Sequence, residues 1–222
     1  HCVRDTHARV SLNSRPVRER PNGGDVIMTI RSQRLILLPI SEGDAESLLG
    51  VFQDSAVRRY LLDDAVVSLD WVKHEIASSN ERFASTGAGL WAIRLTGTTS
   101  IVGFVGFREF FEPPRLQLLY GLLPACWGQG LASEAAKVVC DHAFEVLGFS
   151  RIEAAMDEPN RRSIAVAERL GLCRLNAQVQ THDATAFYEI DRDTWNHKYR
   201  ATALSNNGMQ PTPQSGAADA GR

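Results

Sequence analysis

One stretch of this 222-residue chain decides how the rest is interpreted: Gln117-Leu118-Leu119-Tyr120-Gly121-Leu122-Leu123, followed by Pro124-Ala125-Cys126-Trp127-Gly128-Gln129-Gly130-Leu131-Ala132-Ser133-Glu134. Its first part is a mostly apolar run of strand length, and its second part is a glycine-rich turn that opens a long helical pattern. Such a turn leaves backbone N–H groups unpaired at the helix start, where the helix dipole adds positive charge. The stretch therefore predicts a strand, a turn that binds phosphate or pyrophosphate, and a helix.

Small residues at this turn would let phosphates approach the backbone, because Gly128 and Gly130 lack a Cβ atom and Ala132 is small. A Walker loop is excluded, since no lysine follows either glycine. The dinucleotide fingerprint Gly-x-Gly-x-x-Gly is a nearer match, with Ser133 in place of the third glycine and Glu153 near the expected acidic position. That fingerprint belongs to a parallel βαβ unit, whereas the strands before this turn are predicted to be antiparallel. We therefore disfavour an oxidoreductase.

Working outward, the hydrophobic periods predict strands at 34–39, 90–95, 101–111, 115–123, 151–156, 172–179 and 185–190. They predict helices at 41–49, 69–84, 130–147 and 161–170, with serines at the first two starts and glycines at the last three ends. Short turns at 96–99 and 112–114 make the three central strands antiparallel neighbours. The fold class that accommodates this order is α/β with a mixed, mostly antiparallel sheet and helices on both faces.

Composition is that of a globular domain, with 44% hydrophobic residues and a formal net charge of -2. This balance gives no reason to propose a nucleic-acid or membrane partner, and no apolar run reaches the roughly 20 residues that span a bilayer. The predicted organisation is a disordered extension at 1–27, one domain at 28–200 and a disordered tail at 201–222. Widely spaced cysteines and scattered histidines suggest free thiols, a cytoplasmic protein and no metal site.

Several blocks between residues 34 and 195 together resemble the GCN5-related N-acetyltransferase (GNAT) superfamily, and specifically its ribosomal-protein alanine N-acetyltransferase branch. The family signature Gln/Arg-x-x-Gly-x-Gly/Ala is similar to Trp127-Gly128-Gln129-Gly130-Leu131-Ala132, with Trp127 in the Gln/Arg position. Three further blocks also resemble this branch: Tyr120-Gly121-Leu122-Leu123-Pro124, Glu158-Pro159-Asn160-Arg161-Arg162-Ser163-Ile164 and Glu168-Arg169-Leu170-Gly171.

The resemblance implies an enzyme that moves an acetyl group from acetyl-coenzyme A (acetyl-CoA) to an amine. It implies a central sheet that splays beside the turn, so that the pantetheine arm lies in the gap against Leu122 and Leu123. The pyrophosphate would contact the backbone N–H groups from Gly128 to Ala132, and a backbone N–H near Leu122 would bind the oxyanion. Asn160 would contact the pantetheine arm, and Ser163 would lie near the sulfur and protonate it. Without the resemblance, Asn160 is equally a helix cap and Ser163 a helix-start serine.

The general base is the weak point of this interpretation, because the position where the family often has a glutamate holds Gln117. A base elsewhere, a water chain or an amine that deprotonates unaided would then serve. Since an α-amino group has a lower reference pKa than lysine, a peptide N-terminus is slightly favoured. Glu153 is a possible base, Tyr188 a possible acid and Cys126 a passive thiol. Residues 69–84 lie where this family shapes its acceptor pocket.

Three alternatives stay open at this point. The acceptor can be a small amine such as an antibiotic or a polyamine instead of a peptide N-terminus. The domain can be a non-catalytic module that binds acyl-CoA, which Gln117 would explain. The sequence does not distinguish a monomer from a homodimer.

Overall fold

The structure is a computed structural model, and it describes residues 28–175 and 185–206. Its strands are β1 (Ile30–Arg31), β2 (Leu35–Pro39), β3 (Leu90–Leu95), β4 (Ile101–Phe110), β5 (Arg115–Leu122), β6 (Arg151–Asp157), β7 (Cys173–Arg174) and β8 (Thr185–Asp191). They form one eight-stranded sheet in the order β1-β2-β3-β4-β5-β6-β8-β7. Within this described sheet, every neighbouring pair is antiparallel except β5 with β6, which confirms the mixed, mostly antiparallel fold class.

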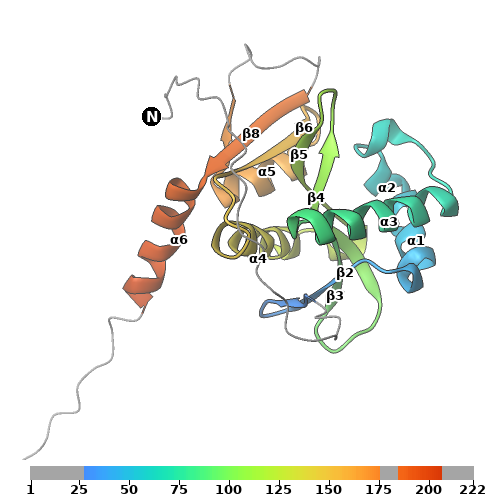
Figure 1. Cartoon of the computed structure of the whole chain (residues 1–222), viewed down its shortest axis with the longest axis horizontal. Helices are drawn as coiled ribbons and strands as arrows, with labels where there is room; N and C mark the ends of the chain where they lie inside the picture. The colour runs from blue at the N-terminus through green and yellow to red at the C-terminus, as the bar shows by residue number, and fades with distance from the viewer. Residues whose placement is uncertain (1–27, 176–184, 207–222) are drawn as a thin grey trace, which may run out of the picture.

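Helices cover both faces of the sheet (Figure 1). They are α1 (Ala45–Gln53), α2 (Ser55–Arg58), α3 (Leu69–Thr86), α4 (Leu131–Glu145), α5 (Arg161–Leu170) and α6 (Arg192–Asn206), with 3-10 turns η1 (Glu42–Asp44), η2 (Leu62–Asp64) and η3 (Pro124–Cys126). No helix in the described ranges is long and apolar enough to cross a bilayer.

Predicted helix ends are confirmed by their hydrogen bonds and backbone angles. The Ser68 hydroxyl accepts the Trp71 N–H at 3.1 Å at the start of α3. Gly87 and Gly171 are the C-caps of α3 and α5, with φ of 76° and 90° in the left-handed region that glycine adopts without strain. Helix α4 ends earlier than predicted, because Val146 is its C-cap and Gly148 follows two residues later.

Alternation along β4 explains how one strand contacts two layers of helices. Phe104 stacks on Phe52 of α1 with ring centroids 4.6 Å apart, within the core that α1 and α3 share with this face. Val105 and Phe107 belong to the other core, together with Val139 of α4. Burial of each large apolar side chain contributes about 1.5–3 kcal/mol, so both helical layers hold the sheet in place.

The sheet separates at the parallel pair in its middle. β5 stays paired with β4 along its length, but its pairing with β6 consists of the single position Gln117–Glu153. Helix α4 makes the crossover between these two strands and packs on the face opposite α1 and α3. Beyond Gln117 the described parts of β5 and β6 have no further strand pairing, which agrees with the predicted splay.

Some predicted boundaries were wrong. The helix predicted at 41–49 is a 3-10 turn followed by α1, which continues to Gln53. Of the strand predicted at 172–179, only Cys173–Arg174 is a strand in the described part, and residues 176–179 lie outside the description. Helix α6 was not predicted, because its sequence is mostly polar and Trp195 is its one fully buried side chain among residues 192–199. Residues 1–27 and 207–222 lie outside the described ranges, and α6 continues past residue 200.

Candidate active site

The turn between β5 and α4 contains glycines in a left-handed conformation. Gly128 and Gly130 have φ of 74° and 76°, and Gly130 is the N-cap of α4 without a side-chain cap. The Glu134 N–H is donated to the Gly130 carbonyl at 3.0 Å, so the N–H groups from Gly130 to Ser133 have no partner inside the helix. Because these donors lie at the positive end of the helix dipole, the turn could hold a diphosphate.

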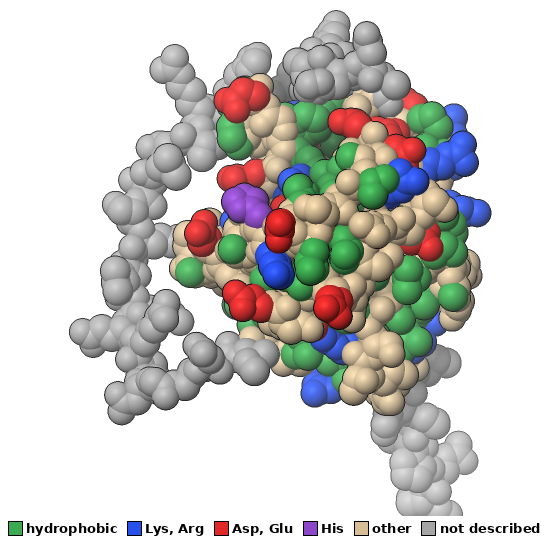
Figure 2. Space-filling model, turned by 90° about the vertical axis from the view of Figure 1, so that its right-hand side faces the viewer, with side chains coloured by type: hydrophobic (Ala, Val, Ile, Leu, Met, Phe, Trp, Pro, Cys, Tyr) green, Lys and Arg blue, Asp and Glu red, His purple; other side chains and the backbone are tan. Residues whose placement is uncertain are grey.

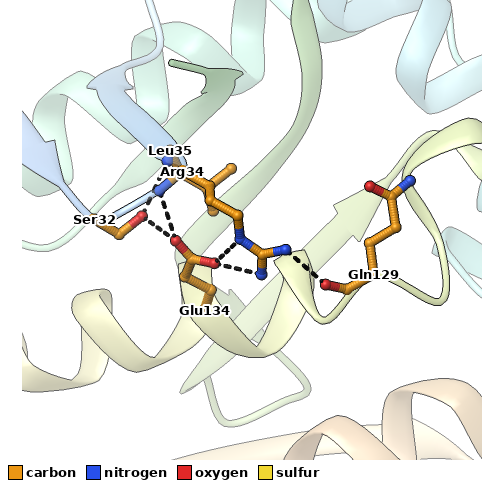
Figure 3. A network of polar contacts seen from close by, with 5 residues as sticks. All are labelled: Ser32, Arg34, Leu35, Gln129 and Glu134. Carbon is orange, nitrogen blue, oxygen red and sulfur yellow. Dashed lines mark hydrogen bonds and ion pairs between the residues drawn. The ribbon is translucent and has the colours of Figure 1, made fainter.

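An ion pair braces this turn from the β2 side (Figure 3). The Arg34 Nε donates to Glu134 Oε2 at 2.7 Å, and its Nη1 donates to the Gln129 carbonyl at 3.0 Å. Glu134 Oε1 accepts the Arg34 backbone N–H at 2.9 Å and the Ser32 hydroxyl at 2.7 Å. The segment just before β2 therefore holds both the first turn of α4 and the glycine turn before it.

These contacts set the ionisation of Glu134. Partial burial alone would raise the pKa of Glu134, but hydrogen bonds from Ser32 and Arg34 and the Arg34 charge outweigh it and lower the pKa. The carboxylate is therefore ionised near neutral pH, where it neutralises Arg34.

Beyond the turn, the last peptide unit of β5 is held at both ends. The Leu123 N–H is donated to the Val102 carbonyl at 2.9 Å, and the Leu122 carbonyl accepts the Trp127 indole N–H at 2.6 Å. Since successive residues of a strand alternate their hydrogen-bonding direction, the Leu122 N–H points away from β4 and toward the gap. Of the two predicted donors, Leu123 is thus used by the sheet, and Leu122 is directed to the cleft.

The first turn of helix α5 lies beside β5. The Asn160 side-chain oxygen accepts the Ser163 N–H at 3.2 Å, so Asn160 is the N-cap of α5. Tyr120 of β5 donates its hydroxyl to the Ser163 carbonyl at 2.8 Å and lies 3.7 Å from the Met156 sulfur. Burial raises the pKa of Tyr120, so its hydroxyl stays protonated. Sequence reasoning missed this contact between β5 and α5.

At the point where β5 and β6 separate, Gln117 is oriented by a carboxylate. Its Nε2 donates to Glu153 Oε2 at 3.1 Å, and Arg115 contacts the same oxygen at 2.6 Å. Gln117 is 1% exposed, and its Oε1 is buried without a hydrogen-bond partner in the described part of the chain. An unpaired buried carbonyl costs about 1–3 kcal/mol, so a donor from a ligand or water would stabilise this position.

Next to these polar side chains, on the same side of the sheet, lies a buried carboxylate of α3. Glu75 accepts Arg82 at 2.8 Å and Arg108 at 2.9 Å, and Arg108 lies across from Gln117 in the β4–β5 register. Outside, on the face formed by α1 to α3, acidic and basic side chains are interspersed with hydrophobic ones (Figure 2). The predicted acceptor-side helix thus contributes charged groups near the Gln117 position.

A strained segment lies near the carboxyl end of β6. Leu62, Asp63 and Asp64 have φ of 53°, 55° and 59°, a left-handed run that non-glycine residues rarely adopt. Burial raises the pKa of Asp157, and the charge of Asp63 raises it further. Asp63 therefore lies close enough to act on the charge of Asp157.

Other reactive side chains belong to the core. Tyr188 is 3% exposed and Cys126 is 8% exposed, and both lie in the cluster around α4, so packing explains them. Among residues 28–175 and 185–206, no group of His, Cys, Asp or Glu side chains is arranged to hold a metal ion.

The fold and the cleft define a class of domain: an α/β enzyme fold in which an extended, phosphate-bearing molecule can lie against an open strand edge. Residues 34–173, well over half of the chain, match the family model described as an acetyltransferase (GNAT) domain. The chain belongs to the GNAT acetyltransferase family.

Similar proteins support this assignment. The N-acetyltransferase YoaA of Bacillus subtilis is 27% identical over 143 residues, which are 64% of this chain and 81% of that protein. The crystal structure of an acetyltransferase from Agrobacterium tumefaciens matches with a TM-score of 0.64 and 25% identity, covering 78% of this chain and 99% of that one. RimL, a ribosomal L7/L12 alpha-N-protein acetyltransferase solved with coenzyme A, matches with a TM-score of 0.62 and 18% identity over 75% of this chain and 99% of its own.

Family membership settles the general chemistry. The protein is an acetyl-CoA-dependent N-acetyltransferase, and acetyl-CoA is its acyl donor. The 18% identity to RimL shows a shared fold and does not assign the chain to a branch of the family.

Proposed function

We propose that this enzyme transfers the acetyl group to a primary amine, either a peptide N-terminus or a small amine, by direct attack on the thioester. One observation carries the proposal: the glycine turn of α4 lies next to a strand edge that is open from the Gln117–Glu153 position to Leu122. A phosphate site and an open edge in one cleft suit a long cofactor with phosphates at one end and amide groups along its arm.

In this arrangement the pyrophosphate contacts the N–H groups of the turn: Gly128, Gln129, Gly130, Leu131 and Ala132. Leu131 is 3% exposed, so it contributes its backbone while its side chain packs in the core. The pantetheine arm follows the open edge of β5, and Asn160 contacts it with its side-chain nitrogen. Trp127 closes the end of β5 through its bond to the Leu122 carbonyl.

The reaction proceeds in balanced steps. A neutral amine attacks the thioester carbon, and the Leu122 N–H stabilises the oxyanion that forms. The amine nitrogen then loses a proton to water or a base, because the Gln117 amide cannot accept one. The C–S bond breaks, and the thiolate takes a proton from the Ser163 hydroxyl, which is replaced from water by the equivalent of the proton that the amine released. The products are the acetylated amine and coenzyme A.

A peptide N-terminus is our first choice of acceptor. Gln117 replaces the acid that would deprotonate a basic amine, and an α-amino group has a reference pKa near 8, compared with about 10.4 for lysine. The RimL neighbour acts on such a terminus, although its identity to this chain supports the fold alone. A small amine is the alternative. The non-catalytic module that Gln117 suggested is set aside, because the family model and the N-acetyltransferase relatives identify an enzyme. We further propose a cytoplasmic protein, since Cys126, Cys140 and Cys173 are free thiols.

Calorimetric titration with acetyl-CoA tests the site. Gly130→Glu puts a side chain and a negative charge against the turn, and should lower the affinity at least a hundredfold. Gly97→Glu is the matched control, because Gly97 also has a left-handed φ, 84°, but lies in the β3–β4 turn. Equal binding by all three proteins would remove the turn from the cofactor site, and no binding by the wild type at millimolar acetyl-CoA would end the proposal.

Release of the coenzyme A thiol with panels of peptides, polyamines and aminoglycosides then identifies the acceptor. Turnover with peptides alone supports the first choice, and turnover with small amines alone supports the alternative. Binding of acetyl-CoA without turnover across all panels would overturn both choices of acceptor.

A further inference from the structure

Two arginines flank the glycine turn, and they differ in their electrostatic partners. Arg34 lies on the β2 side, where its Nη2 would be 3.8 Å from a Cβ atom placed on Gly130. Its charge is neutralised by Glu134, with Nη2 and Oε2 separated by 2.6 Å. Arg34 therefore braces the turn without adding net positive charge to it.

Arg162, in the first turn of α5, contacts the residue that precedes the turn. The centre of its guanidinium group is 4.4 Å from the centroid of the Trp127 ring, which is the geometry of a cation–π contact. The side chain is exposed, and no ion pair holds it within the described ranges 28–175 and 185–206. A full positive charge is thus held next to the residue that precedes Gly128.

The Trp127 ring that carries this charge is itself fixed. Its indole N–H is donated to the Leu122 carbonyl at 2.6 Å, and its backbone N–H is donated to the Pro124 carbonyl at 3.0 Å. A guanidinium stacked on a fixed ring keeps its N–H groups in a plane directed outward, where they can form the paired hydrogen bonds that phosphate oxygens accept. The ring therefore pre-orients Arg162 and lowers the entropy cost of ordering its side chain.

We propose that Arg162, held on the Trp127 ring, binds the diphosphate of coenzyme A, so that the phosphate site has a backbone half from the turn and a side-chain half from α5. This inference rests on the proposed function, which places the diphosphate at the turn. Binding of the diphosphate by Arg162 would also affect the residues near the thioester. Because Asn160 and Ser163 belong to the start of the same helix, a diphosphate that draws Arg162 toward the turn also draws these residues to the cleft.

Arg162 would recognise a phosphate, and coenzyme A carries phosphate at two places: the diphosphate and the 3′-phosphate of its ribose. Dephospho-coenzyme A lacks only the 3′-phosphate and separates them. The full chain and its Arg162→Gln variant are titrated with coenzyme A and with dephospho-coenzyme A. The variant should bind both ligands about tenfold or more weakly, which is the effect of losing one charged hydrogen bond. The slope of log Kd against log salt should also decrease.

Arg161→Gln is the matched control, since Arg161 is the adjacent exposed arginine and the charge change is identical. Its affinity for both ligands should stay within about twofold of the wild type, and Arg162→Lys should fall between the wild type and Arg162→Gln, because it keeps the charge but not the planar fork. If Arg161→Gln and Arg162→Gln lost the same affinity, the loss would come from the change in net charge alone, and the assignment of Arg162 would be overturned. A loss confined to coenzyme A would assign Arg162 to the 3′-phosphate instead. Wild-type protein that binds neither ligand would refute the proposed function itself.

Discussion

The two sides of the cleft between β5 and β6 are built differently. On the α4 side, the groups that can bind phosphate are backbone N–H groups of consecutive residues at one turn. On the α3 side, the polar groups are side chains from four elements: Glu75, Arg108, Gln117 and Glu153. A site of consecutive backbone groups depends on local sequence, whereas a site of dispersed side chains depends on the register of the whole sheet. This difference explains why the sequence predicts the acetyl donor, acetyl-CoA, but does not identify the amine that accepts the acetyl group.

The largest expected effect is the loss of one backbone N–H on the cofactor side. Leu122→Pro removes the predicted oxyanion donor but no bond to β4, since the Leu123 N–H makes that bond. The value of kcat should fall about 100-fold or more, while acetyl-CoA affinity changes little. Leu122→Ala is the control, because it removes the buried side chain and keeps the N–H. If the two variants have the same kcat in a thiol-release assay, Leu122 is not the donor.

On the acceptor side, the largest effect should be on stability. Glu75→Leu leaves Arg82 and Arg108 without their shared carboxylate, and the free energy of unfolding should fall by about 3 kcal/mol. Urea unfolding measures this, with the exposed Glu81→Gln of the same helix as control. Acetyl-CoA affinity should stay within about twofold below the unfolding transition. A large loss of affinity would mean that the two sides are energetically coupled.

Glu134→Gln should have a smaller, pH-dependent effect. Glu134 has a lowered pKa in the folded protein, so its stabilising effect is present above the unfolded pKa and is lost as pH falls through the folded pKa. The variant should be less stable by about 1 kcal/mol at pH 7. Unfolding of both proteins from pH 7 down to acid should show the difference shrinking below pH 4.5, the ordinary pKa of a glutamate. A pH-independent difference would assign the loss to packing.

The smallest effect on stability should come from Gln117→Met. This change removes an unpaired buried carbonyl but also the bond to Glu153, so stability should change by about 1 kcal/mol or less. If the Gln117 carbonyl receives an N–H from the acceptor, KM for the amine rises while the acetyl-CoA Kd stays constant. An unchanged KM would show that the carbonyl has no role in acceptor binding.

Sequence alone predicted the parts of the protein that depend on neighbouring residues. The glycine turn, the Ser68 cap and the Gly171 helix end are local, and the structure has all three where they were expected. The splay at Gln117 followed from family resemblance, since no local pattern separates a paired from an unpaired strand.

The rest depended on contacts between distant segments. Arg34 and Glu134 are 100 residues apart, and nothing in either stretch indicates that they meet. Arg162 reaches Trp127 only because α5 returns beside the turn. The sequence also could not predict that the Gln117 side-chain carbonyl is buried without a hydrogen-bond partner in the described fold, because this depends on every group that surrounds it. The identity of the acceptor amine stays a prediction, because the side chains on the acceptor side come from distant segments of the chain.

The single strand pairing at Gln117–Glu153 also bears on how long the protein survives. It leaves β1–β5 and β6–β8 joined in the sheet by one position, with α4 as the connection. Acetyl-CoA bound in the gap would contact both parts like an added strand, and at 100 times its Kd a ligand stabilises the folded state by about 2.7 kcal/mol. Protein saturated with acetyl-CoA should then be cleaved more slowly by an added protease than protein without it.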